Sequence, residues 1–126
     1  MPTIERFEEV KAWKKGRELA SSIYRVTASG MVAKDFELRD QLRRAALSVV
    51  SNIAEGFERR GDREFRRFLS IAKGSAGEIR AQMYVALDAG LVAEADFQEV
   101  LALATETSRV IGGLMRYLDG RDAPTG

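Results

Sequence analysis

Apolar side chains recur every three to four residues along four stretches of the chain, and short polar segments with glycine separate these stretches. Such spacing places the apolar side chains on one face of an α-helix, whereas a half-buried strand alternates every second residue. The pattern predicts helices at about residues 7–27, 35–56, 62–89 and 95–119, with a frayed tail at 120–126. Short connections between four helices of similar length predict one all-α domain over residues 1–126, an antiparallel up-down-up-down four-helix bundle.

Glycines inside the expected helices indicate where the packing is close. Glycine weakens a helix by about 1 kcal/mol relative to alanine, so a glycine on a packed face favours a tight helix crossing. Gly16 lies on the apolar face of the first helix. Gly74 and Gly77 in the third helix, and the pair Gly112–Gly113 in the fourth, are likewise expected where another helix approaches.

Polar and small residues mark the expected helix ends. Asp62 is a candidate N-cap for the third helix, and Gly90 suits the left-handed position after its last turn. Gly120 is expected to end the fourth helix. Trp13 and Tyr24 fall on the apolar face of the first helix, where we expect them in the core.

The second and fourth helices are apolar over a wider arc than one bundle core requires. A surface helix needs an apolar stripe of only about 100°. Phe36, Val50 and Phe57 widen this arc in the second helix, and apolar positions within 97–118 do so in the fourth. A permanent contact between subunits would bury the surplus, and the alternative is a large core in a small protein.

The chain contains neither cysteine nor histidine. Disulfides, zinc fingers, histidine-based di-iron sites and most hydrolase triads are therefore excluded. No apolar segment approaches the roughly 20 residues that span a bilayer, and the charged N-terminal sequence is unlike a signal peptide. We expect a cytoplasmic protein without a membrane partner, metal or other cofactor.

Charge is unevenly distributed, although the formal net charge is only +1. Residues 1–80 hold 17 Lys and Arg against 12 Asp and Glu, whereas residues 81–126 hold 3 against 7. Such asymmetry suits either an acidic partner or contacts between neighbouring copies of the same protein.

A basic stripe is predicted on the outer face of the third helix and the turn before it. It consists of Arg59, Arg60, Arg63, Arg66, Lys73 and Arg80, continued by the aromatic ring of Tyr84. Several phosphate contacts and one stacking ring would give salt-sensitive, sequence-tolerant nucleic-acid binding. The alternatives are contacts to the acidic C-terminal third of another subunit, or a solvated face with local ion pairs.

A polar seam borders the apolar stripes of the second and third helices. Its members are Gln41, Arg44, Ser48, Asn52 and Glu55 on the second helix, and Glu64, Ser75, Glu78 and Gln82 on the third. We favour a hydrogen-bond network that fixes the register of the helices, with Arg44 balancing a carboxylate. Alternatively, Glu55 and Glu78 form a carboxylate pair for acid–base chemistry or a divalent cation, although two glutamates alone make a poor metal site.

The same central segment resembles the four-helix-bundle family named after proteins encoded in intervening sequences of 23S rRNA. The most specific part is the run Asn52-Ile53-Ala54-Glu55-Gly56, followed by Phe68-Leu69, Ala72 and Gly74-Ser75. The resemblance covers about residues 7–118. It implies a homo-oligomer, a pentameric barrel of bundles. Relatives include the accessory protein of diversity-generating retroelements, which works with a reverse transcriptase and nucleic acid.

We therefore expect a non-enzymatic oligomeric scaffold or adaptor that associates with RNA, with DNA or with a nucleic-acid enzyme. The alternative is a protein-only interaction assembly with no nucleic-acid role. An enzyme that uses Glu55 and Glu78 is a third hypothesis.

Overall fold

The computed structural model describes residues 4–122, and most of them are helical. The elements in order are a 3₁₀ turn η1 (Phe7–Glu9), helix α1 (Lys11–Val26), a second 3₁₀ turn η2 (Met31–Lys34), and helices α2 (Phe36–Glu58), α3 (Asp62–Asp88) and α4 (Glu94–Asp122). No strand occurs within residues 4–122. The expected all-α fold with four helices is confirmed.

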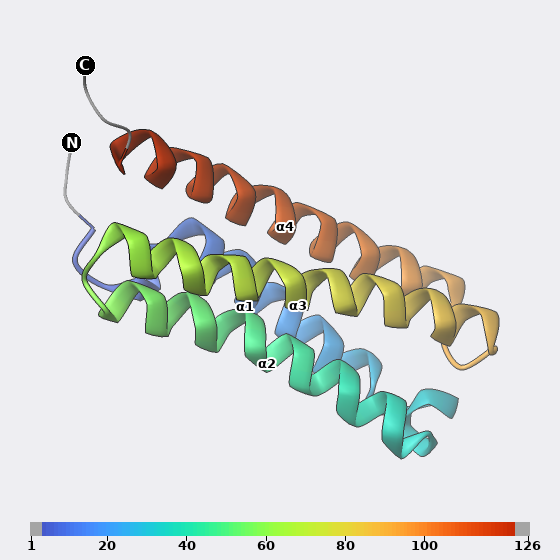
Figure 1. Ribbon diagram of the computed structural model, residues 1–126. Coiled ribbons are helices and arrows are strands. Elements are labelled where there is room, and N and C mark those ends of the chain that lie inside the picture. Colours follow the sequence, from blue (N-terminus) through green and yellow to red (C-terminus); the bar gives the residue numbers. More distant parts are fainter. Residues whose placement is uncertain (1–3, 123–126) are drawn as a thin grey trace.

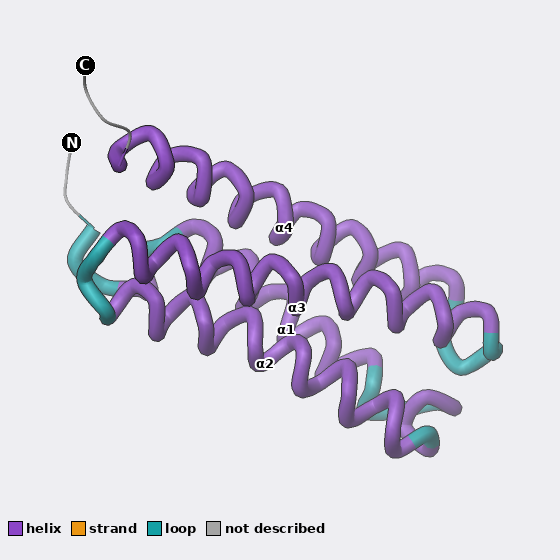
Figure 2. Tube along the Cα trace, in the orientation of Figure 1, coloured by secondary structure: helices purple, strands orange, loops and turns teal. Residues whose placement is uncertain are grey.

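Consecutive helices run antiparallel, and each packs against the next, while α1 also packs against α4 and closes the bundle (Figure 1). The connections are short, so the topology is up-down-up-down (Figure 2). The α2–α3 turn lies at the same end as the start of α1 and the end of α4. At the opposite end, the Val32 N–H donates to the Leu91 carbonyl at 3.1 Å and joins the other two connections.

The interior is filled by aliphatic side chains from all four helices. Their three-to-four-residue spacing gives each helix one apolar stripe, and the four stripes meet along the bundle axis. The largest fully buried side chains of the helices include Leu19, Ile23, Leu42, Ile53, Leu69, Ile79, Met83 and Ile111.

Two helix crossings depend on glycine. A Cβ atom at Gly16 would lie 2.9 Å from a methyl group of Val49, so the expected close crossing of α1 and α2 is confirmed. The contact of α2 with α3 is tighter, because a Cβ atom at Gly56 would lie only 2.6 Å from the Cβ atom of Phe68. These helices approach at distances that a larger residue would prevent.

The same expectation is wrong for the other glycines, considered within the described chain. A Cβ atom at Gly74 or Gly77 would meet nothing within 4 Å. At Gly112 the nearest atoms belong to the Lys73 and Arg116 side chains, both 3.5 Å away, and not to another backbone. The reason is geometric: no group of the described residues lies beside Gly74 and Gly77 on α3, and at Gly112 side chains fill the space between α3 and α4.

The starts of the helices differ in detail from the sequence expectation. The first helix is split, because Val10 has extended backbone angles (φ −74°, ψ 122°) between η1 and α1. The Asp35 carboxylate caps α2 by accepting from the Leu38 N–H at 3.1 Å. The N-cap of α3 is Gly61, since Asp62 is already helical and its carboxylate pairs with Arg121 at 3.1 Å.

The C-terminal end of α3 follows the sequence expectation. Gly90 has φ +72°, and its N–H donates to the Leu87 carbonyl at 3.0 Å, while the Leu91 N–H donates to the Ala86 carbonyl at 2.9 Å. This pair of bonds is a Schellman motif.

Helix α4 does not end at the glycine near its C-terminus. It continues through Gly120 to Asp122. Of the tail expected to fray, residues 120–122 are therefore helical, and residues 123–126 lie outside the described residues.

One aromatic expectation fails. Tyr24 is 40% exposed, and the Arg43 guanidinium lies 4.6 Å from the centre of its ring. Trp13 is half-buried against the core and meets the ring of Phe7 edge-on at 5.1 Å. Tyr24 stays outside because its position on α1 faces the rim of α2, where Arg43 covers it.

Candidate nucleic-acid interface

A groove of about 410 Å³ lies between α3 and α4 on the outside of the bundle. Three cationic side chains line it: Arg66 and Lys73 from α3, and Arg116 from α4. Its remaining lining residues are Ser70, Gly74, Gly112, Met115 and Asp119. The groove therefore collects two members of the predicted basic stripe and one cation from the acidic C-terminal third.

These cations come together over the glycine in the middle of α4. The Lys73 Cε and the Arg116 Nη1 both lie 3.5 Å from the point where a Cβ atom of Gly112 would stand, which is ordinary van der Waals distance. A lysine of α3 and an arginine of α4 therefore lie over the same position of α4.

Only part of the positive charge in the groove is neutralised. Arg66 pairs with Asp119, and Lys73 and Arg116 have no ion-pair partner among residues 4–121. Two uncompensated cations over a shallow groove attract anions, and the attraction is stronger than the net charge of the whole chain suggests.

The other members of the predicted stripe lie in the α2–α3 turn and on α3, and they do not line this groove. Arg59 pairs with Glu55 at 3.0 Å and stacks on Phe68, which turns it toward α2. Arg60, in the α2–α3 turn, has a positive φ of 63°. Arg63 and Arg80 are exposed, and neither forms an ion pair within the described residues.

Tyr84, the aromatic residue at the end of the stripe, contacts α4 with one side of its ring. The Tyr84 ring meets Phe97 of α4 edge-on, with 5.0 Å between ring centroids, and it is otherwise exposed. One face of the ring therefore remains open to a stacking partner.

The sequence did not point to Arg116. Only the register of α4 against α3 brings this residue opposite Lys73, and periodicity within one helix carries no information on that register. The sequence also predicted a packed helix crossing at Gly112, whereas its actual neighbours are two charged side chains.

The polar seam between α2 and α3 is present at its centre. The Ser48 and Ser75 hydroxyl groups are hydrogen bonded at 2.7 Å. The Asn52 side-chain amide donates to the Ser48 carbonyl at 2.8 Å and to its hydroxyl at 3.0 Å. A small cavity of about 160 Å³ extends the seam and is lined by Gln41, Arg44, Ala45, Ser48, Ser75 and Glu78.

The two glutamates of the alternative carboxylate pair are not brought together. Ser48 lies opposite Ser75, so Glu55 sits seven residues toward the α2–α3 turn and Glu78 three residues away from it. At 1.5 Å per residue, about 15 Å of helix separates them along the axis. Glu55 pairs with Arg59, and Glu78 lines the small cavity with Arg44.

The remaining seam residues have other surroundings. Two hydrogen bonds from Arg67 hold the pKa of the Glu64 carboxyl below its ordinary value of 4.5. The side-chain amide oxygen of Gln82 (Oε1) is buried and accepts no hydrogen bond from the described chain. Arg44 makes no ion pair within residues 4–121. No group of three or more acidic side chains in the described residues is placed to hold a metal ion.

This arrangement of helices places the chain among the antiparallel four-helix-bundle proteins, with a cationic groove on one side. Residues 8–113 match the family model described as 23S rRNA-intervening sequence protein. Because the match spans well over half of the sequence, the chain belongs to this family.

A solved structure supports the fold. The chain is similar to a crystal structure of a protein with unknown function from the S23 ribosomal protein family of Bacteroides thetaiotaomicron VPI-5482. The TM-score is 0.75 at 19% sequence identity, covering 83% of this chain and 95% of that chain. A comparison with curated proteins found no match. None of the described helices combines the length and the apolar character that crossing a membrane requires.

Proposed function

We propose that the protein is a non-enzymatic oligomeric scaffold that contacts nucleic acid through the groove between α3 and α4. One observation carries this proposal: Arg66, Lys73 and Arg116 converge on one groove that contains a single acidic residue, Asp119. The family is named for sequences within 23S rRNA. A nucleic-acid enzyme bound to the same strand belongs to this proposal.

The chemistry of the groove favours the phosphate backbone over the bases. Lysine and arginine neutralise phosphates, and the small floor residues Ser70, Gly74 and Gly112 let a strand approach closely. No helix N-terminus or amide side chain stands among the residues that line the groove to read base edges. Binding should therefore be sequence-tolerant, with the open face of Tyr84 available to stack one base.

The salt dependence follows from the number of cations. Three phosphate contacts on a single strand give a slope of about −2 in log affinity against log salt. Between about 50 and 200 mM salt, the affinity should fall about 20-fold. Participation of Arg63 and Arg80 would make the slope steeper.

A charge-reversal experiment tests the groove. Fluorescence anisotropy with mixed-sequence single-stranded RNA at low salt should show binding by the wild type and strongly reduced binding by Lys73→Glu/Arg116→Glu. The control Lys11→Glu/Lys34→Glu makes the same change of charge at exposed sites outside the groove. Equal loss in both variants would mean that only net charge matters. An unaffected groove variant would refute the site.

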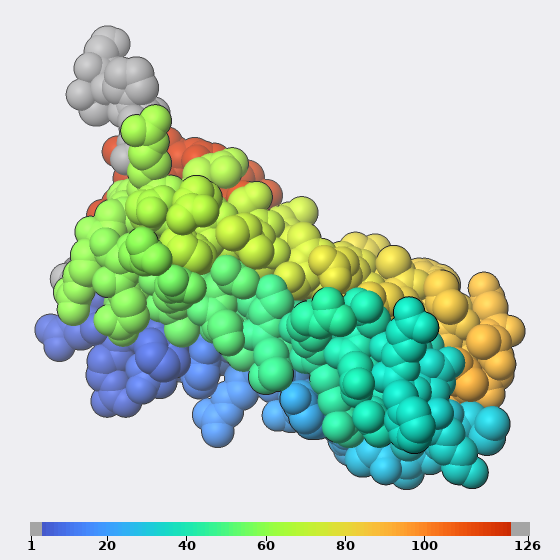
Figure 3. Space-filling model, turned by 60° about the horizontal axis from the view of Figure 1, so that its bottom comes forward, coloured from blue at the N-terminus to red at the C-terminus, as the bar shows by residue number. Residues whose placement is uncertain are grey.

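Self-association is the second part of the proposal. Ile71 and Val85 of α3 are 43% and 59% exposed, and Leu47 of α2 is also exposed. Figure 3 shows the face that α2 and α3 form. Gly77 weakens α3 by about 1 kcal/mol relative to alanine, although no group of the described residues lies within 4 Å of the space beside it. A helix from a second copy would use that space, and the resemblance implies five copies.

The oligomer is tested by its mass in solution. Light scattering should give several times the chain mass of 14.0 kDa. Gly77→Leu fills the open space on α3 and should lower this mass without unfolding the bundle. Gly120→Leu, at an equally open position in the last turn of α4, is the matched control. A wild-type monomer would refute self-association.

The exposed apolar residues also support the alternative, a protein-only interaction assembly. The two functions differ in one result. If the wild type forms the oligomer but binds no single-stranded RNA at micromolar protein, the basic groove serves contacts between proteins. The proposal includes no catalysis, because the two candidate carboxylates are not brought together. Glu55 pairs with Arg59, whereas Glu78 lines the small cavity with Arg44.

A further inference from the structure

A second groove lies on the other side of α4, between α4 and α1, and its volume is about 670 Å³. This size falls within the range of small-molecule sites in proteins, about 300–1,000 Å³. It is separate from the α3–α4 groove and shares no residue with it. Its cationic lining residues are Lys14, Arg17 and Arg25, and both Ser21 and Ser22 contribute hydroxyl groups.

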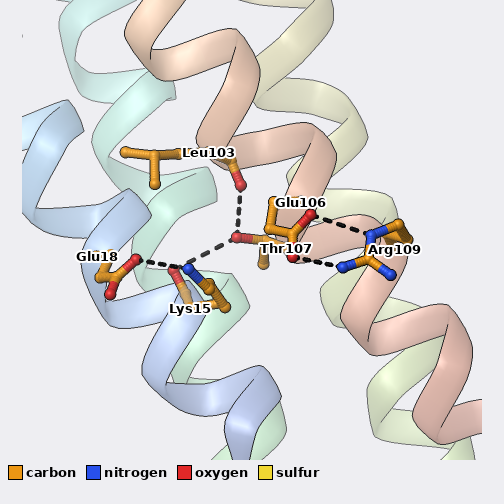
Figure 4. Close-up of polar contacts among 6 residues, drawn as sticks. All are labelled: Lys15, Glu18, Leu103, Glu106, Thr107 and Arg109. Atoms are coloured by element: carbon orange, nitrogen blue, oxygen red, sulfur yellow. Dashed lines mark hydrogen bonds and ion pairs between the residues drawn. The ribbon is translucent and has the colours of Figure 1, made fainter.

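The acids of this groove are already matched by other cations. Glu18 pairs with Lys15 at 3.3 Å (Figure 4). Glu99 pairs with Arg25, which also lies 3.5 Å from Asp96. These contacts fix Arg25 against α4 and leave the charge of the groove to its remaining cations.

Two cations stay uncompensated. Lys14 and Arg17 form no ion pair within residues 4–121. They stand three residues apart on one side of α1, so both reach the same part of the groove. The guanidinium carbon of Arg17 lies 5.7 Å from the ring centre of Trp13, and its N–H groups donate to no acceptor in the described residues.

An independent observation comes from Ser22. The residue lines the groove and is 6% exposed, and its hydroxyl oxygen has no hydrogen-bond partner in the described chain. A buried hydroxyl without a partner is unfavourable, and most buried polar side chains in native proteins are hydrogen bonded. Serine has one side-chain torsion before its hydroxyl, so a single rotamer change turns it toward a molecule in the groove.

We propose that the α1–α4 groove binds a phosphorylated small molecule of nucleotide size. Lys14 and Arg17 take the phosphate, the Ser22 hydroxyl donates to one of its oxygens, and Leu103 packs against the organic part. Figure 4 places Leu103 on α4 facing α1, next to Glu18. The site is separate from the proposed nucleic-acid interface, and either can fail without the other.

The surroundings select a small anion over a polymer. A phosphate monoester carries close to two negative charges and three acceptor oxygens, which matches two free cations and a hydroxyl donor. Glu18 and Glu99 also line the groove, and Asp96 lies beside Arg25. A long phosphate backbone would pass these carboxylates and be repelled, whereas a single phosphate group stays clear of them.

Calorimetry with adenosine 5′-monophosphate as the probe tests the site on the full chain. Saturable binding is expected for this nucleotide, weaker binding for inorganic phosphate, and none for adenosine. Lys14→Gln/Arg17→Gln should reduce the affinity at least about tenfold, since two charge-assisted contacts are lost. The control Lys11→Gln/Lys34→Gln removes the same charge at exposed sites outside both grooves and should bind as the wild type does.

Ser22→Ala separates a binding role from a structural one. Without ligand this variant should melt at or above the wild-type temperature, because it removes an unpaired buried hydroxyl. With the nucleotide, its affinity should fall several-fold. Trp13 is the only tryptophan, so its fluorescence reports any movement of Arg17.

Three results would overturn the proposal. One is no saturable binding of the nucleotide by the wild type. Another is equal binding of the nucleotide and of adenosine, because the phosphate would then be irrelevant. The last is unchanged affinity in Lys14→Gln/Arg17→Gln, because the nucleotide would then occupy another place.

Discussion

Substitution of Gly56 by alanine gives the sharpest test of the bundle packing. The added Cβ atom would stand 2.6 Å from the Phe68 Cβ and 3.1 Å from a ring carbon of Phe65. The first of these contacts involves an atom attached directly to the backbone of α3. No side-chain rotation relieves it, so α2 and α3 must move apart.

The magnitude follows from two opposing effects. Overpacking of this kind costs about 1–3 kcal/mol, and a contact to a backbone-anchored atom belongs in the upper half of that range. Replacing glycine by alanine inside a helix returns about 1 kcal/mol. The net loss of unfolding free energy in Gly56→Ala is therefore about 1–2 kcal/mol. For a domain of this length, that lowers the melting temperature by roughly 4–8 °C.

A matched substitution of another glycine should change the free energy of unfolding in the opposite direction. At Gly113 of α4 the only atom near a new Cβ is a guanidinium nitrogen of Arg116 at 3.8 Å, which is ordinary contact. Gly113→Ala should therefore gain up to about 1 kcal/mol from helix propensity alone. Thermal unfolding followed by circular dichroism, with urea titrations for both variants, measures the two changes. If Gly56→Ala melts at or above the wild type, the reasoning about this crossing is wrong.

Other predictions concern single contacts. Arg60→Gly should raise the stability by about 0.5–1 kcal/mol because φ is +63°, and Arg60→Ala should give no such gain in the same thermal assay. Ser48→Ala takes away the partner of the Ser75 hydroxyl, which is 6% exposed, and should cost about 1–3 kcal/mol. Adding Ser75→Ala should restore most of this loss, and additive costs in a urea double-mutant cycle would refute the bond. Hydrogen bonds from Arg109 hold the pKa of the Glu106 carboxyl below its ordinary value of 4.5. Because the folded value is lowered, the stabilisation is present above the unfolded pKa and is lost as pH falls through the folded one. Arg109→Gln should move the Glu106 midpoint upward in an NMR titration, and an unmoved midpoint would contradict the contact.

The fold was predictable because each helix shows its core stripe locally. Leu42, Val49 and Ile53 are buried as their spacing requires, and the glycine after α3 forms the expected Schellman turn. The features missed depend on contacts between elements. The last turn of α4 continues past Gly120, and in that turn Arg121 reaches Asp62 at the start of α3.

The candidate site was predictable only in part, for a related reason. Helical periodicity predicts that Lys73 and Arg66 are exposed cations on one helix, but their convergence with Arg116 depends on the register of α3 against α4. The same register separates Glu55 from Glu78. Similarly, a glycine in a sequence records only that a side chain is missing. At Gly16 a neighbouring helix fills the space, while at Gly112 two cations do.

The hydrogen bond from Val32 to Leu91 makes the two ends of the bundle mechanically unequal. It ties the α1–α2 connection to the α3–α4 connection, so this end opens only as one cooperative unit. The other end holds the α2–α3 turn, the start of α1 and the last part of α4, and Arg66, Arg116 and Asp119 lie toward it. In hydrogen exchange, the Val32 amide should report global unfolding, while amides near the groove exchange through smaller openings. A strand could therefore widen the groove at low cost while the far end stays closed.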